Sequence, residues 1–507
     1  MRSDVTFIKG NGASKRVVAG EDYISGLLLY TGSIPTAFSV TPIKQLYSIV
    51  DAENAGILAD YSDETKASAV YTVTAAGTNG DTLNLKVKEP LNVTVDLGTY
   101  TKVSTDTTVA AIATAIALII NNGTSTHGYI ATALSGAVTI TPRAGLGIWL
   151  NTGSALVATL SAGATIAGTI TAFTGGVASK KAIWHYHIAE FFRGNPNGQL
   201  FVGFFSIPGT YAFTEITTMQ TFANGKIRQI GIFKDSAAYA SGDLTLIDGV
   251  IKTYNDAKHK PLSALYGADL KATADITAVA DLSALSANKV SSIIGQDGAG
   301  LGAFLFYTTG KSVTQLGIAL GLLSASAVSE DFGQPSKFSL SNGYENDIPA
   351  FANGQMLSDS ALSDSALDAI DSKRHIFGQR YVGYAGTYFN DNHCAIATSS
   401  DYAFINDNRV IDKAIRGIYA ALVPYLKAKL LKNSDGTLAD TTVAFFESLA
   451  LQPLYQMSRD QDLGEVVDSD VSIDPTQNVT ATNLLVISVK LNENGIARFI
   501  SVPISFK

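Results

Sequence analysis

Residues 199–207, QLFVGFFSI, form a continuous apolar run with the length of one buried strand. Downstream of this run, short apolar stretches alternate with amphipathic helical patterns. The sequence predicts further strands at 228–233, 261–267 and 289–295, and helices at 213–224, 244–257 and 314–324. Such alternation is typical of a mostly parallel sheet covered by helices on both faces. The predicted fold class is therefore α/β, within an α+β multidomain chain of 507 residues.

Upstream of this region, the composition changes in one block. Residues 69–176 carry eight charged side chains in 108 positions, whereas the remaining 399 residues carry 72. The block is rich in Thr, Ala, Gly and Val, as strands and tight turns prefer. Its pattern predicts a hairpin within 69–95, a helix at 106–121, and strands at 129–134 and 137–141. We interpret it as an inserted small β-rich domain, Ig-like or ββαββ, that protrudes without disturbing the core.

The pattern of predicted helices and strands changes again in the last 150 residues. A helix is predicted at 358–372, followed by strands at 377–385 and 395–398, and the strongest amphipathic helix of the chain at 409–426. The chain then ends in a predicted hairpin arm, with strands at 484–491 and 496–506. The predicted domains are an N-terminal arm (1–20), a core (21–68 and 177–355), the insert (69–176), a C-terminal domain (356–482) and a C-terminal arm (483–507).

The terminal strand is unusual because it alternates cleanly between apolar and other positions. Ile496, Arg498, Ile500, Val502, Ile504 and Phe506 share one face. Such a strand is an exposed edge unless another strand pairs with it. Residues 5–8 offer a matching extended piece at the other end of the chain. The two ends either pair within one chain or add strands to neighbouring subunits, and the residues alone leave both arrangements open.

Charge and targeting signals exclude several classes of protein. The net charge of −8 argues against a general nucleic-acid binder. The N-terminus has no apolar core of a secretory signal, and no apolar stretch reaches the roughly 20 residues that span a bilayer. Together with a single cysteine, these features predict a soluble protein made in a reducing cytoplasm.

Two local charge patches oppose each other in sign. Residues 409–432 hold six basic side chains against one acidic, and residues 457–475 hold six acidic against one basic. One interpretation is a solvated helix face and an acidic loop. The other is that each patch meets an oppositely charged partner.

Candidate catalytic motifs are incomplete. Gly310-Lys311-Ser312 resembles the end of a phosphate-binding loop, but Leu305 stands where the motif needs glycine. Cys394 directly follows His393, and adjacent strand residues point to opposite faces, so the pair is a poor nucleophile and base.

One histidine cluster is a possible metal site. His185, His187 and Glu190 could bind zinc or iron, but no fourth ligand is identifiable, and we favour a strand that runs into a helix at 188–192. The sequence predicts no enzyme, no cofactor and no metal.

Three segments carry a family resemblance. They are HIAEFFRGNP at 187–196, RVIDKAIRGIY at 409–419 with its continuation LVP at 422–424, and NSDGTL at 433–438. These segments resemble contractile phage tail sheath proteins, specifically the DUF2586-type sheath family of prophages. The resemblance covers residues 1–68 and 177–507, and the insert is the departure from it.

The resemblance implies a structural subunit of a contractile tail sheath, polymerising as stacked hexameric rings around a tail tube and driving that tube through the target cell envelope. Its implied partners are further copies of itself, the tube protein, and baseplate and tail terminator proteins, with no nucleic acid and no membrane contact. The implied location is the tail of a virion or phage-like particle, assembled in the bacterial cytoplasm.

The resemblance also assigns residues. The tube-facing residues would be Arg409, Lys413, Arg416, Lys427 and Lys429. Strand exchange between subunits would involve Val5, Phe7, Leu485, Ile487, Val489, Ile496, Ile500, Val502, Ile504 and Phe506.

Two alternatives stand beside this hypothesis: another tail component, such as baseplate or tube, and an α/β hydrolase with an accessory β-domain. The hydrolase would need a polar pocket at the carboxyl ends of the parallel strands. The sequence offers no residues to form it.

Overall fold

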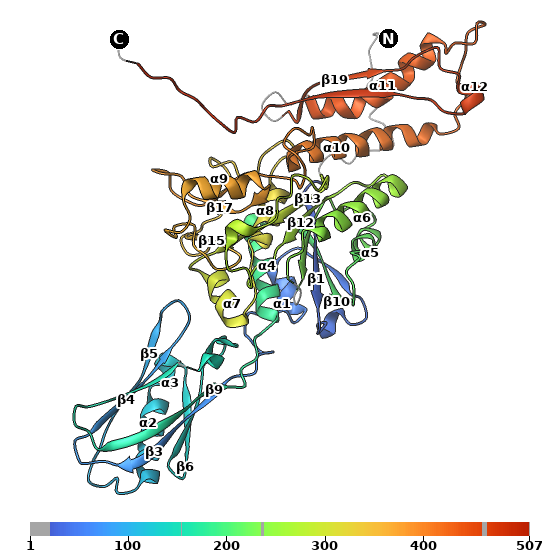
Figure 1. Cartoon of the computed structure of the whole chain (residues 1–507). Coiled ribbons are helices and arrows are strands. Elements are labelled where there is room, and N and C mark those ends of the chain that lie inside the picture. The colour runs from blue at the N-terminus through green and yellow to red at the C-terminus, as the bar shows by residue number, and fades with distance from the viewer. Residues whose placement is uncertain (1–20, 154, 235–237, 459–463, 506–507) are drawn as a thin grey trace, which may run out of the picture.

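A computed structural model describes residues 21–153, 155–234, 238–458 and 464–505. Three bodies follow one another in space (Figure 1): the insert, the α/β core, and a C-terminal domain that lies on the far side of the core from the insert. In the described part of the chain, no helix combines the length and apolar character needed to cross a membrane.

The core is built on one seven-stranded sheet, in the order β16-β13-β12-β11-β1-β10-β2. All neighbours in it are parallel except β2, which runs antiparallel to β10. The predicted mostly parallel sheet is therefore confirmed, and the apolar run at 199–207 forms β10. The strands are β1 (Ile24–Thr31), β2 (Ile43–Leu46), β10 (Gln199–Ser206), β11 (Gln229–Lys234), β12 (Ser263–Gly267), β13 (Val290–Ile293) and β16 (His375–Ile376).

Helices cover both faces of this sheet. Because side chains alternate along a strand, Leu27 and Leu29 of β1 pack with α4 (Lys181–Gly194) and α8 (Leu316–Ala325). Leu28 and Tyr30 pack instead with α5 (Glu215–Phe222) and α6 (Gly242–Lys258) on the other face. The remaining short elements of this region are α1 (Ile49–Asn54), α7 (Leu301–Thr309), β14 (Gly295–Asp297), β15 (Pro349–Phe351), α9 (Asp364–Ser372), β17 (Gly378–Gln379) and β18 (Tyr388–Phe389).

The segment HIAEFFRGNP lies in α4, where it packs closely against α8. A Cβ atom added at Gly317 would collide with the carbonyl oxygen of His187, and one at Gly321 with that of Phe191. Just beyond the helix, Asn195 donates a hydrogen bond from Nδ2 to Ser324 Oγ over 2.8 Å. The motif thus serves helix packing in the core.

The predicted strand at His185 and His187 is wrong, because both residues belong to α4. The helix starts seven residues before Ile188, at Lys181, and its apolar face fills the core between the sheet and α8. His187 is fully buried, and burial lowers its pKa to about 3. No group of three or more His, Cys, Asp and Glu side chains within the described residues is arranged to hold a metal ion.

The insert forms a separate body with its own core around α2 (Val109–Asn122). Its two antiparallel sheets have the orders β6-β7-β3-β9 and β5-β4-β8. The strands are β3 (Ser68–Ala76), β4 (Thr82–Lys88), β5 (Thr94–Thr101), β6 (Ile130–Leu134), β7 (Ala137–Thr141), β8 (Leu156–Leu160) and β9 (Ile166–Thr174), and α3 (Thr124–His127) follows α2. The β-rich domain is as expected; β4 and β5 form its hairpin, whereas β3 pairs with β7 and β9 in the other sheet.

The insert is seated on the core through α7. The amide of Ile148 donates to the carbonyl of Thr308 over 2.9 Å, and the rings of Trp149 and Tyr307 meet edge to face at 5.4 Å. The guanidinium group of Arg143 also lies 5.6 Å from the centroid of Phe304. The insert therefore protrudes with its base fixed on the core (Figure 1).

The C-terminal domain pairs α10 (Ile405–Leu422) and α11 (Asp440–Ser458) with a two-stranded sheet of β19 (Val466–Ser472) and β20 (Ser488–Glu493); α12 (Val479–Thr482) lies between those strands. The domain is α+β with a two-stranded antiparallel sheet, as predicted, but its strands differ. Residues 496–505 form no strand, and β20 pairs instead with the stretch expected to be an acidic loop. This pairing lets Val471, Val489 and Leu491 pack on the apolar faces of α10 and α11.

Other boundaries in this region also differ from the predictions. The helix expected at 409–426 spans Ile405–Leu422. The helix expected at 358–372 begins at Asp364. The strand expected at 377–385 is reduced to β17, and the one at 395–398 to a single bridge between Ala287 and Ala395. Side chains such as those of Asn390 and His393 make many of the hydrogen bonds here, in place of a regular ladder.

A buried carboxylate at the start of α7 gives the core a specific pH dependence. Glu345 accepts hydrogen bonds from the amide of Leu301 at 3.0 and 3.1 Å and lies beside Asp297 and Glu190. Burial, the hydrogen bond to Asp297 and the nearby negative charges raise the pKa of Glu345 from 4.5 to about 8. The folded state thus keeps a proton that the unfolded state releases, so this contribution to stability is lost as the pH rises from 4.5 to 8.

We therefore expect Glu345→Gln to remove part of the stability loss that the unmodified protein shows over that pH range. Glutamine can still donate to Asp297 and accept from Leu301, yet has no proton to lose. Denaturant unfolding at several pH values measures the difference. Asp256→Asn, on the exposed side of α6, is the matched control and should keep the original pH profile; identical profiles for all three proteins would contradict the assignment.

Candidate functional site

The basic patch of α10 divides into residues that face their own chain and residues that face solvent. Arg409 is buried, and its guanidinium group donates to Ser326 Oγ over 2.8 Å and to the carbonyl oxygens of Ser326 and Ala327. Burial lowers its pKa to about 10. In this conformation the Arg409 side chain is inaccessible to a tube protein, and its tube-facing role stays a prediction.

Lys413 and Arg416 lie on the same helix and bind carboxylates of the same chain. Lys413 Nζ is 2.9 Å from one oxygen of Asp22 and also pairs with Glu465, and Arg416 Nη2 is 2.7 Å from the other oxygen of Asp22. Burial alone would raise the pKa of Asp22, but the charges of Lys413 and Arg416 outweigh it and keep this pKa below its ordinary value. Within the subunit, both cations are therefore already compensated.

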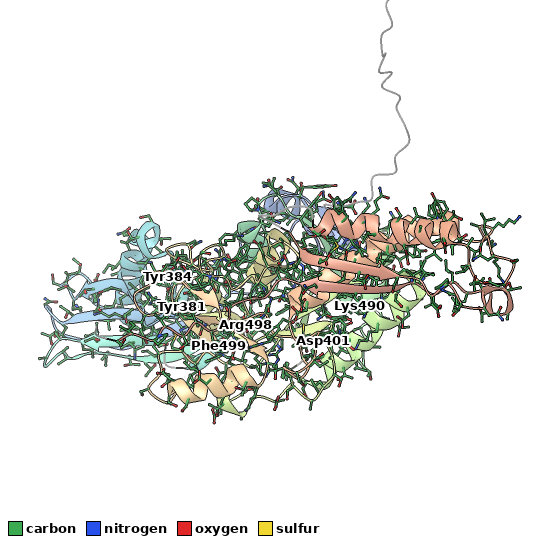
Figure 2. The ribbon with its side chains drawn as sticks, turned by 90° about the horizontal axis from the view of Figure 1, so that it is seen from above. Tyr381, Tyr384, Asp401, Lys490, Arg498 and Phe499 are labelled. Carbon is green, nitrogen blue, oxygen red and sulfur yellow. The ribbon has the colours of Figure 1, made fainter. Side chains whose placement is uncertain are left out.

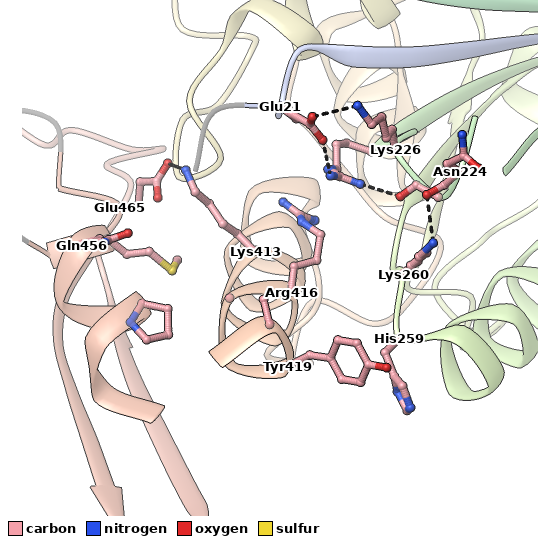
Figure 3. A pocket seen from close by; sticks show the side chains of 16 residues that line it. Glu21, Asn224, Lys226, His259, Lys260, Lys413, Arg416, Tyr419, Gln456 and Glu465 are labelled. Carbon is pink, nitrogen blue, oxygen red and sulfur yellow. Dashed lines mark hydrogen bonds and ion pairs between the residues drawn. The ribbon is translucent and has the colours of Figure 1, made fainter. Parts of the chain in front are cut away.

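Lys413, Arg416 and Glu465 line a cavity of about 390 Å³ between the core and the C-terminal domain (Figure 3). Next to Asp22, Glu21 pairs with Lys226 and Arg228 of the core, both at 3.2 Å. The acidic pair at 21–22 thus joins basic side chains of two domains. The predicted N-terminal arm precedes this pair, and its residues Val5 and Phe7 lie outside the described residues.

Lys427 and Lys429 are different, because both are exposed in the segment that follows α10. Neither makes an ion pair in the part of the chain that the structure describes. The exposed Leu426 and the partly exposed Tyr425 lie beside them, and Tyr425 packs edge to face on Phe445 of α11 at 5.1 Å. We call residues 425–429 the tip. The lysine charges at the tip have no ion-pair partner among the described residues, whereas the cationic groups of Arg409, Lys413 and Arg416 are already bound within the subunit.

The predicted C-terminal arm also divides in two. Leu485 and Ile487 pack on the cluster around Phe446, and Val489 packs with the side chains between α10 and β19. These three residues therefore belong to the body of the domain. Beyond β20, Ile496 is half-buried, Ile500, Val502 and Ile504 are 69–91% exposed, and Phe506 lies outside the described residues.

Sequence reasoning missed the anchor of this arm. The sequence contained one sign of this anchor: Arg498 is the only charged residue on the alternating face of the predicted terminal strand. Its guanidinium group contacts Asp391 of the core at 3.0 Å. The missed anchor at the other end, Glu21–Asp22, has partners up to 394 positions away, which no local pattern indicates.

The residues weighed as catalytic candidates occupy structural positions. The Cys394 thiol is buried, and burial raises its pKa to about 12. Its contacts are Ser291 Oγ at 3.8 Å and Asn408 Nδ2 at 3.6 Å rather than an imidazole. Ser312 donates to the carbonyl of Ala352, and the Lys311 ammonium group is 3.9 Å from Asp269.

Two family models match nearly the whole chain. The model of DUF2586, N-terminal domain, matches residues 4–393, and that of DUF2586, C-terminal domain, matches residues 401–507. No curated protein matches the chain.

Several solved sheath proteins share low similarity with it. The helical sheath of the anti-feeding prophage in its contracted state is 13% identical with a TM-score of 0.42, over 63% of this chain and 81% of that one. The PVC sheath of an extracellular contractile injection system in its contracted state is 12% identical with a TM-score of 0.40, over 64% and 80%. A sheath tail protein from Listeria innocua is 9% identical with a TM-score of 0.35, over 92% and 94%.

Proposed function

The chain belongs to the DUF2586 family, and from this premise we propose that it is a structural subunit of a contractile sheath, which polymerises around a tail tube as stacked rings and contracts to drive that tube through a cell envelope. The family is the one that the three sequence motifs resemble. The proposal makes the chain a component of an assembly rather than a catalyst.

One observation carries the proposal: the segment after β20 is apolar, extended and without a strand partner among the described residues. Phe499, Ile500, Val502 and Ile504 are 96, 81, 69 and 91% exposed. Isolated exposed apolar residues are ordinary, but four within six positions of an extended chain form a ready-made strand for another subunit. Sheet β19–β20 has outer edges unpaired among the described residues, so it offers the matching acceptor.

Strand exchange suits a sheath that must stay connected while its rings move. A strand added to a neighbour's sheet is held by regular, directional backbone hydrogen bonds and by buried apolar side chains. Exposed charge pairs, in contrast, contribute about 0–1 kcal/mol each and can be broken and remade as subunits rotate. We assign the permanent links to the arms and the breakable links to surface charges. Helical tubes formed by the purified chain, seen by electron microscopy, test this assignment.

For the contact with the tube, we favour the exposed tip over the middle of α10. Lys427 and Lys429 are free to meet an acidic partner, whereas Lys413 and Arg416 would first have to leave Asp22. We expect the double variant Lys427→Glu/Lys429→Glu to lose co-assembly with tube protein while self-association continues, because like charges would then face the tube.

Co-sedimentation with tube protein at increasing salt measures this effect, since screening should weaken the contact of the unmodified chain too. The matched control reverses two exposed lysines far from the tip in sequence, Lys66 and Lys88, and should co-sediment normally. Unchanged tube binding by the Lys427/Lys429 variant would remove the tube-facing role from the tip.

A further inference from the structure

The guanidinium group of Arg498 sits in a notch of the core domain. Its Nε lies 3.1 and 3.0 Å from the two carboxylate oxygens of Asp391, and its Nη2 lies 3.2 Å from Asn392 Oδ1. A second carboxylate, that of Asp331, is 3.8 Å away. The ring of Phe404 forms one wall, with its centroid 3.4 Å from the guanidinium carbon.

The notch is suited to a guanidinium group rather than to any cation. A planar fork can face carboxylates along its edge and an aromatic ring on its flat side, which an ammonium group cannot do at once. Asp391 is held in place because it also accepts from the amide of Asn392 over 2.7 Å. Asp407 and Glu493 add negative charge close to Arg498.

The chain on both sides of Arg498 is attached weakly. Residues 494–505 form no ladder with any strand that the structure describes. Among the described residues, every side-chain hydrogen bond and ion pair between 495–505 and the body of the protein involves Arg498. The next residue, Phe499, is 96% exposed (Figure 2). One side chain therefore fixes the place where the arm leaves its own subunit.

We propose that the notch formed by Asp331, Asp391 and Phe404 is a releasable docking site for Arg498 that sets how far the C-terminal arm can reach. With Arg498 docked, residues 499–505 extend from the notch over at most about 23 Å, at ~3.3 Å per residue. With Arg498 released, the free segment starts at residue 495, because Asn494 donates to the carbonyl of Gly464, and the same arithmetic gives about 36 Å. The docked arm reaches a near neighbour, and the released arm follows a neighbour that moves away.

The role assigned to the notch, setting the reach of the arm toward a neighbouring subunit, rests on the proposed function. The docking of Arg498 itself can be tested without assembly. Nitroxide labels on Phe499→Cys, directly beside Arg498, and on Ala369→Cys, on the exposed side of α9, report the spread of distances between the start of the arm and the core by pulsed electron paramagnetic resonance. Because Cys394 is the only native cysteine and is buried, the labels go to the introduced sites. The monomeric fraction of the full chain is measured.

We expect a narrow distance distribution in the otherwise unmodified protein, which Arg498→Gln broadens at least twofold and shifts to longer distances. Asp391→Asn should broaden it similarly, and Arg498→Lys should fall between, because lysine keeps the charge and loses the planar fork. Lys490→Gln, on the exposed side of β20, removes one charge of the same sign outside the notch and should leave the distribution narrow.

Equal widths for the unmodified protein, Arg498→Gln and Asp391→Asn, with unchanged thermal unfolding, would overturn the docking site. A broad distribution in the unmodified protein would overturn it as well. If the docking site is found but the chain forms no tubes, the proposed function fails while the notch stands; if tubes form and the widths do not change, only the notch fails.

Discussion

Deletion of residues 494–507 is expected to yield a folded monomer that no longer polymerises. The deletion removes Phe499, Ile500, Val502 and Ile504, which belong to no apolar cluster among the described residues of their own subunit. Burying each such side chain against a neighbour is worth about 1.5–3 kcal/mol. Losing four of them costs several kcal/mol at every subunit contact, and hence a more than thousandfold rise in the concentration needed for assembly, at about 1.4 kcal/mol per factor of ten.

The position of the cut matters. A truncation that begins at residue 484 would also remove β20, whose Val489 and Leu491 pack on the C-terminal domain, so it would unfold that domain instead of isolating the arm. Sedimentation velocity measures the loss of polymer, and circular dichroism verifies the fold. Ser501→Ala/Ser505→Ala, in the same arm, is the matched control and should assemble. Normal polymers from the 494–507 deletion would show that the arm is dispensable.

The second large effect is expected at the contact between α4 and α8. A Cβ at Gly321 would collide with the carbonyl oxygen of Phe191 and lie 3.1 Å from the Cα of Gly194. Backbone atoms of a packed helix cannot move aside cheaply, so Gly321→Ala should destabilise the protein by about 2–3 kcal/mol and Gly321→Leu by more. Urea unfolding measures both free energies.

Gly249 of α6 provides the matched control. A Cβ added there meets nothing within 4 Å, so Gly249→Ala should stabilise the helix by about 0.5–1 kcal/mol through its better helix propensity. The same Gly→Ala substitution is therefore expected to destabilise the protein at Gly321 and to stabilise it at Gly249. If Gly321→Ala is as stable as the unmodified protein, the α4–α8 contact is not as close as described.

Sequence patterns predicted the core strands β10, β11, β12 and β13 because these strands are buried on both faces, but they missed β1, which is equally buried and lies between β11 and β10. β10 and α8 are apolar along most of their length, so each is easily recognised as a buried element. The alternation of strands and helices then favours a parallel sheet. In the insert, the pattern located most strands but not their partners. Alternation marks one face of a strand and says nothing about which neighbour pairs with it, so the pattern did not reveal that β3 pairs with β7 and β9 in a different sheet from β4.

Two strands of the insert and one of the C-terminal domain were missed for a related reason. β9 contains Ala167, Gly168 and Ala172, residue types that strands disfavour, and β8 has only five residues. β19 carries Asp468 and Asp470 on its exposed side, and these acidic residues masked Val466 and Val471, which face the helices. The charges of α10 were interpreted as one outward patch because a helical pattern cannot reveal that Asp22, almost 400 residues away, lies against it.

The most direct test of the central claim is electron microscopy of the negatively stained, purified full-length chain. We predict ribbed hollow tubes or six-fold rings, with length and number increasing with protein concentration. Dispersed particles of monomer size at high concentration, both with and without tube protein, would contradict the assignment of this chain as a contractile sheath subunit.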